Sequence, residues 1–272
     1  MLPKSASAPF KRSDPGLVSN PAPHAFGGWA GRLRYRAGAL LADRLNVWGL
    51  WVQTRGRYSV ARYLFSASLI ACTAARGPDH PRTATIVNNL AVSLKYLGRL
   101  AAAEPLFRRG FAVREAVLGH EHPSTASSAN NLAALLQDMG DFQEAEKLYL
   151  HALNIWRVTI PVPHLALAKV LNNLGALAED RGEFGRAEQF YRQALDITDQ
   201  SLGPAHVATA TCLNNLALVL LEQNDLLGAE PFLRQALVVF RAQLGDQHPL
   251  SVTVTENVAA LELRRRGAQE AH

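Results

Sequence analysis

The sequence has few of the residues that build disulfides, metal sites or membrane spans. Its 272 residues include only two cysteines, Cys72 and Cys212, far apart in helical patterns. We interpret both as small core residues in a reducing compartment, and expect a cytoplasmic protein. No long unbroken apolar run predicts a transmembrane helix, and the N-terminus lacks the apolar segment of a secretory signal.

Motifs that mark enzymes are also missing. The sequence shows no phosphate-binding loop, nucleophile elbow or HExxH motif. We therefore expect no enzyme, no cofactor, no bound metal and no small-molecule substrate. Five evenly spaced histidines raise the question of a metal site. Packed helices lie ~8–10 Å apart, whereas zinc ligands lie ~2 Å from the ion, so one histidine per repeat cannot complete such a site. We interpret these histidines as loop residues just before the next helix, whose first residue is a proline after His80, His122 and His248: His80, His122, His164, His206 and His248.

Positive charge is concentrated in the N-terminal part. Residues 1–79 hold 11 lysines and arginines against 3 acidic residues, whereas residues 80–272 hold 17 against 20. The sequence pI of about 9.5 thus belongs to the first part alone. It does not predict a nucleic-acid-binding surface over the whole chain.

Asparagine pairs recur at intervals of 42 residues, although asparagine is a poor helix former. The glycines at 98, 140 and 182 share this period, and no residue is inserted or deleted between copies, which predicts a repeat array. We divide the chain into an arm at 1–37, a degenerate copy at 38–79, copies at 80–121, 122–163, 164–205 and 206–247, and a capping helix with tail at 248–272. The pairs are Asn88-Asn89, Asn130-Asn131, Asn172-Asn173 and Asn214-Asn215.

Each copy reads as two helices. In the second copy, helix A runs from about Pro123 to Met139 and helix B from Phe142 to Trp156. Gly140 between them supplies a left-handed C-cap. In a linker such as "LGHEHP", the final proline suits the first position of the helix that follows.

The positions of small residues distinguish repeat families whose repeats have similar lengths. Ala133 in helix A and Ala145 and Ala152 in helix B, with Tyr149 between the last two, allow close helix approach. This spacing resembles the tetratricopeptide repeat rather than HEAT or armadillo repeats. The doubled "NNLA" and the "LG..HP" linker resemble its 42-residue subtype in kinesin light chains. The resemblance implies an all-α, right-handed superhelical solenoid, whose A helices line a concave surface that binds proteins or peptides.

The second asparagine of each pair falls on the less apolar side of helix A. We predict that these residues form a ladder for the backbone of an extended peptide, because an amide both donates and accepts hydrogen bonds. The alternative is that they link neighbouring helices, which is our interpretation for the first asparagine of each pair. The predicted ladder is Asn89, Asn131, Asn173, Asn215 and Asn257.

Two further columns flank the ladder. The first holds hydroxyl residues and Lys169; the second holds Asp138, Asp180 and Glu222 between Tyr96 and Arg264. We include Lys169 and the three acids among the peptide-binding residues. The acids either favour a partner with basic residues or form ordinary solvated surface.

The N-terminal arm is rich in Pro, Gly, Ser and Ala, which predicts that it is mostly disordered. Arg32, Arg34 and Arg36 lie near Trp29, Trp48 and Trp51. We interpret the arm as a polar tail with an aromatic cap over the first helix pair, or as a basic aromatic patch that contacts an acidic membrane or nucleic acid. The sequence thus favours a non-catalytic scaffold for a peptide. Two alternatives are a peptide-sensing regulatory fragment and an anchor that uses the arm.

Overall fold

The computed structural model describes residues 28–270, which form helices and no strands. Short connections join each helix to the next one along the chain. The helices are α1 (Gly28–Gln53), α2 (Tyr58–Arg76), α3 (Pro81–Tyr96), α4 (Leu100–Leu118), α5 (Pro123–Asp138), α6 (Phe142–Thr159), α7 (Leu165–Asp180), α8 (Phe184–Leu202), α9 (Val207–Glu222), α10 (Leu226–Leu244) and α11 (Pro249–Glu270).

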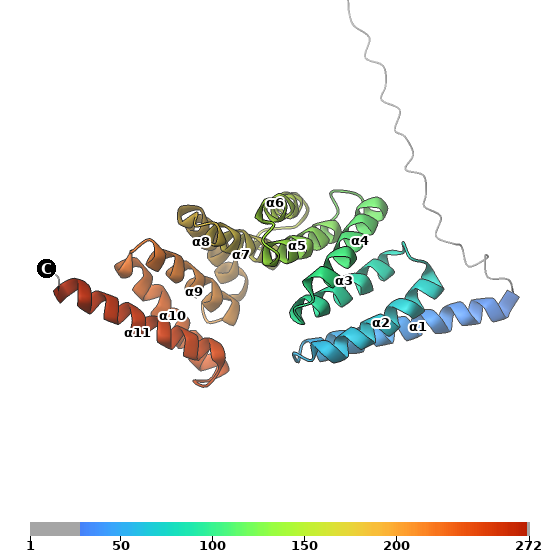
Figure 1. Cartoon of the computed structure of the whole chain (residues 1–272), viewed down its shortest axis with the longest axis horizontal. Coiled ribbons are helices and arrows are strands. Elements are labelled where there is room, and N and C mark those ends of the chain that lie inside the picture. The colour runs from blue at the N-terminus through green and yellow to red at the C-terminus, as the bar shows by residue number, and fades with distance from the viewer. Residues whose placement is uncertain (1–27, 271–272) are drawn as a thin grey trace, which may run out of the picture.

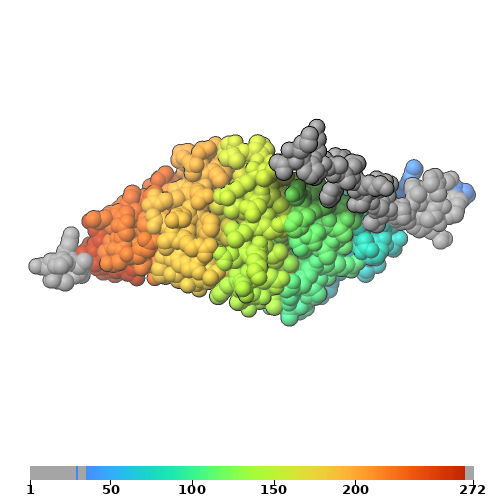
Figure 2. Space-filling model, turned by 90° about the horizontal axis from the view of Figure 1, so that it is seen from above, coloured from blue at the N-terminus to red at the C-terminus, as the bar shows by residue number. Residues whose placement is uncertain are grey.

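Consecutive helices pack in pairs, and the pairs stack into an arch. α1 packs on α2, α3 on α4, and so on to α9 on α10, while α11 packs on α10. Figure 1 shows α3, α5 and α7 nearer the hollow of the arch, with α4, α6 and α8 outside them. From above, the repeats follow one another as slabs along the long axis (Figure 2). The predicted all-α solenoid is therefore confirmed.

A left-handed residue ends each helix A and turns the chain into helix B. Gly140 has φ +84°, as predicted, and Gly98 and Gly182 have φ +70° and +73°. Asn224 takes this place in the next copy with φ +63°, a conformation that asparagine tolerates better than most residues. The backbone conformation therefore repeats every 42 residues, as the sequence does.

Helix pairs approach closely because a small residue faces a large one. Ala133 and Tyr149 are both buried, and at the equivalent place Gly175 lies against Tyr191. The degenerate copy repeats the contact with Gly49 and Phe65: a Cβ on Gly49 would lie 2.4 Å from the ring. The first copy is therefore packed like the others, although Trp48 stands where they carry leucine.

The predicted boundary of the N-terminal arm is wrong. Residues 28–37 are the first turns of α1 and not part of a disordered arm, and residues 1–27 lie outside the described residues. A long helix can include glycines at 28, 31 and 38 because packing on α2 stabilises it. Trp48 and Trp51, which the sequence analysis assigned to the aromatic cap, are 65% and 57% exposed.

The periodic histidines do more than precede the next helix. Each is the N-cap of a helix A, and its Nδ1 accepts the backbone N–H two residues later. For His122 the donor is Ser124, at 3.0 Å. The bond requires an unprotonated Nδ1 and satisfies a helix-end N–H that has no partner within the helix. The histidines that accept these five bonds are His80, His122, His164, His206 and His248.

Candidate functional site: the hollow of the arch

The asparagine pairs form hydrogen bonds between successive A helices. The second asparagine of one repeat donates its Nδ2 to the Oδ1 of the first asparagine of the preceding repeat. Asn173 of α7 donates to Asn130 of α5 at 3.0 Å. The same bond joins Asn89 to Asn46, Asn131 to Asn88, Asn215 to Asn172 and Asn257 to Asn214, over 2.9–3.4 Å.

These bonds explain why two adjacent asparagines recur. The prediction that the first asparagine links neighbouring helices is confirmed. The second asparagine takes part in the same bond as the donor, which is the role that the sequence analysis gave as the alternative to the ladder. Asn130 is only 2% exposed, whereas its partner Asn173 is half-buried. Asn173 uses one N–H in the bond and keeps a second N–H and its Oδ1 for other partners.

Two lysines lie on the A helices α3 and α7, Lys95 and Lys169. Lys95 donates to the Ala134 carbonyl oxygen at 2.7 Å and pairs with Asp138 at 3.1 Å. The pKa of Lys169 is lowered, first by desolvation and then by the Lys95 ammonium, although the Lys169 side chain is exposed. Sequence reasoning missed Lys95, whose only signal was its position beside Tyr96.

The predicted acids lie at the C-terminal ends of the A helices, where Asp138 ends α5, Asp180 ends α7 and Glu222 ends α9. Gln137 of α5 donates to Asp180 of α7 at 2.6 Å. Burial raises the pKa of Glu179, which accepts from the Tyr191 hydroxyl at 2.9 Å, and the carboxylates of Asp180 and Glu222 raise it further. Asp180 and Glu222 thus lie close enough to act on Glu179, which sequence reasoning missed.

The hydroxyl groups in the column beside the ladder form hydrogen bonds within their own helices. Thr85, Ser127 and Thr211 each donate to the carbonyl oxygen four residues earlier, over 3.0–3.1 Å. Tyr96 stacks on Tyr58, with ring centroids 4.5 Å apart. The charges on the A helices come from the lysines and the carboxylates, of which Lys95 and Asp138 pair with each other.

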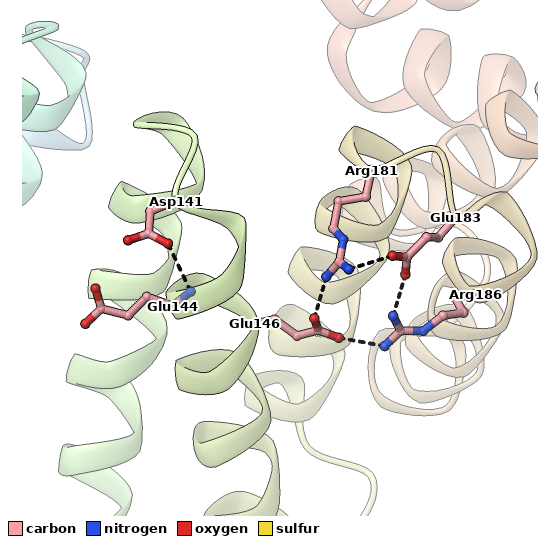
Figure 3. Close-up of polar contacts among 6 residues, drawn as sticks. All are labelled: Asp141, Glu144, Glu146, Arg181, Glu183 and Arg186. Carbon is pink, nitrogen blue, oxygen red and sulfur yellow. Dashed lines mark hydrogen bonds and ion pairs between the residues drawn. The ribbon is translucent and has the colours of Figure 1, made fainter.

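Away from the asparagine chain, an ion-pair network joins two repeats. Glu146 of α6 contacts Arg181 at 2.5 Å and Arg186 of α8 at 2.7 Å, and both arginines also pair with Glu183 (Figure 3). Asp141 caps α6 by accepting the Glu144 N–H at 3.1 Å. Among residues 28–270, no three His, Cys, Asp or Glu side chains gather to hold a metal ion. No helix there is long and apolar enough to cross a bilayer.

The model of the tetratricopeptide repeat family matches residues 41–116, 86–157 and 166–237, which is more than half of the chain. The chain belongs to the tetratricopeptide repeat family. This repeat fold typically serves as a non-catalytic protein-interaction module, and the recognition of the family from the sequence is confirmed. Among curated proteins, none matches the chain.

Several solved structures share the fold of this tetratricopeptide repeat chain. BtubC (BKLC) from P. vanneervenii is 24% identical, with 78% of this chain and 84% of that one covered and a TM-score of 0.64. A putative kinesin light chain of Podosopora anserina with nearly identical TPR-like repeats is 22% identical, with 78% and 97% covered and a TM-score of 0.59. The apo form of RapI is 16% identical, with 84% and 85% covered and a TM-score of 0.63.

Proposed function

We propose that the hollow of the arch binds an extended segment of another protein, and that the chain acts as a non-catalytic scaffold. The observation that carries this proposal is the asparagine chain. Five half-buried asparagines, one on each of α3, α5, α7, α9 and α11, form a row and retain unused amide groups. Amides at the spacing of packed helices, ~8–10 Å, meet about every third residue of an extended chain.

The inter-repeat bond supports this role rather than competing with it. It fixes the orientation of each second asparagine, so that less side-chain freedom is lost when a peptide binds. Asn131 and Asn173 then offer one donor and one acceptor each to a peptide backbone. Recognition of the backbone alone is independent of the peptide sequence.

Charge supplies the selectivity in this proposal. Asp180 and Glu222, with the poorly hydrated Glu179, attract lysine or arginine at one side, and Lys169 attracts an acidic group at the other. The partner is therefore a segment with a basic residue and an acidic group on opposite sides. Because a cation stabilises the ionised form of Glu179, binding of a basic segment should strengthen as pH rises through the raised pKa of Glu179.

A peptide library displayed on phage tests the proposal. Selected peptides should be enriched in lysine or arginine, and Asp180→Asn with Glu222→Gln should weaken their binding. The matched control is Asp196→Asn, which removes an exposed carboxylate from α8 outside the A helices. Equal losses in the two variants, or selection of no peptide, would contradict the proposal.

A further inference from the structure

The N-terminal end of the arch has an apolar surface that the proposed groove does not use. Its main side chains come from the outer sides of α1 and α2, and we call them together the N-terminal apolar face. Tyr63 is 65% exposed and Ile70 73% exposed. The face consists of Leu40, Trp48 and Trp51 on α1 and Val60, Tyr63 and Ile70 on α2.

The repeat period provides an internal comparison for this face. One period after Tyr63 and Ile70 stand Pro105 and Ala112, and one period later the exposed Lys147 and Asn154. The outer side of α6 is thus more polar than that of α2, whereas α10 carries the exposed Val238 at the position of Ile70. On α1, Trp48 and Trp51 occupy positions that are buried in a later copy, as Leu132 and Leu135 are. In Figure 1, α1 lies at the end of the arch, with no further described helix beyond it.

A packed helix does not suit this face. Arg44 stands where Ile86, Val170 and Val254 are buried in later repeats, so a helix packed here would bury an arginine. Charge also opposes a second copy. Residues 28–79 contain eight arginines and two acidic residues, of which Asp43 already pairs with Arg76 at 2.8 Å. Two such ends would repel each other.

Arginines lie directly beside aromatic rings of the face. The Arg55 guanidinium is 3.7 Å from the centroid of the Trp51 ring, and that of Arg62 is 4.2 Å from the Tyr63 ring. Trp and Tyr are enriched where hydrocarbon meets headgroups, and arginines near a bilayer are attracted by anionic lipids. We propose that the N-terminal apolar face docks on an anionic lipid bilayer, with α1 and α2 lying along its surface.

Vesicle binding of the full chain tests this proposal. The chain should sediment with vesicles of equal parts phosphatidylcholine and phosphatidylglycerol, but not with phosphatidylcholine alone, and its tryptophan emission should shift to the blue. Trp48→Ser with Trp51→Ser should weaken binding at least about tenfold. Arg44→Gln with Arg55→Gln should weaken it roughly 30-fold, at about 1 kcal/mol for each arginine.

The control replaces exposed apolar residues outside the face. Leu227→Ser with Val238→Ser on α10 should leave vesicle binding unchanged, and circular dichroism verifies that each variant is folded. Three results would overturn the proposal: no binding to anionic vesicles, unchanged binding by both face variants, or displacement from the vesicles by RNA. A dimer in sedimentation velocity that Trp48→Ser disrupts would show instead that a second copy covers the face.

Discussion

Gly175 of α7 lies against the ring of Tyr191 of α8, so that a Cβ added to the glycine would fall 2.6 Å from Cε1. This contact sets how closely helices A and B of that repeat approach. It also explains why the four A helices from α3 to α9 carry alanine or glycine at this position.

Gly175→Leu should therefore destabilise the chain far more than Ala134→Leu. Leucine at 175 must displace a buried ring, and overpacking of this kind costs about 1–3 kcal/mol. Ala134 is only partly buried, and leucine there should change the free energy of unfolding by less than about 0.5 kcal/mol. Denaturant titration of both variants measures the difference. Similar losses would show that the two faces of helix A are wrongly assigned.

Much of this packing could be predicted from the sequence, because strict periodicity turns one helix-pair contact into many. The glycine turns and the contact between Ala133 and Tyr149 follow from the spacing alone. The same contact between Gly49 and Phe65 was missed, since tryptophan replaces leucine beside Gly49 and hides the repeat. The start of α1 was missed because its glycines lower helix propensity, which tertiary packing overrides.

The site was only partly predictable, for a different physical reason. Periodicity places Asn130 and Asn173 on neighbouring helices, but it does not reveal which amide atoms meet. The histidine caps were missed because histidine is not among the preferred N-cap residues. Their signal was the 42-residue period directly before each helix A, together with a ring nitrogen that accepts a hydrogen bond.

The histidine caps predict a specific mutational pattern. His122→Ala should lower the free energy of unfolding by about 0.5–2 kcal/mol, because the Ser124 N–H loses its acceptor. His122→Asn should retain most of the stability, since asparagine is a preferred cap. Thermal melting of both variants measures the pattern, and an asparagine variant as unstable as the alanine variant would argue against a capping role.

His80 predicts loss of stability in mild acid. Burial and then the charge of Arg76 lower the pKa of His80 below its ordinary 6.5. The folded chain thus binds fewer protons than the unfolded chain, and this contribution is full above pH 6.5 and is lost as pH falls through the lowered value. His80→Asn caps without titrating, so its stability should depend less on pH. Identical pH profiles of wild type and variant would contradict this.

The Glu146 network should contribute a modest, salt-sensitive stabilisation. Hydrogen bonding to Arg186 lowers the pKa of Glu146, so its contribution is present above the ordinary 4.5 and is lost as pH falls below it. The arginines are largely exposed, and Glu146→Gln should therefore cost only about 0.2–1 kcal/mol, less in high salt. Glu104→Gln, which breaks a pair within α4, should cost less. A larger effect from Glu104→Gln would exclude a bridging role for Glu146.

Truncation tests whether the repeats depend only on their neighbours. Removal of residues 206–272 should leave a shorter helical protein with poorer solubility, because α8 and α7 then expose the apolar surface that α9 covers. Circular dichroism measures the remaining helix. Complete loss of helix would mean that the array folds as one cooperative unit.

The asparagine pair of Asn130 and Asn173 gives the most direct test of the peptide groove. Asn130→Ala and Asn173→Ala both remove the same inter-repeat bond, so each should lose about 0.5–1.5 kcal/mol of stability, partly offset by the better helix propensity of alanine. Only Asn173→Ala also removes an amide from the groove. In calorimetric titration with a phage-selected peptide, Asn173→Ala should weaken binding roughly 2- to 13-fold while Asn130→Ala leaves it nearly unchanged. If both variants lose stability and both bind the peptide like wild type, the asparagines only hold the repeats together and the ladder is refuted.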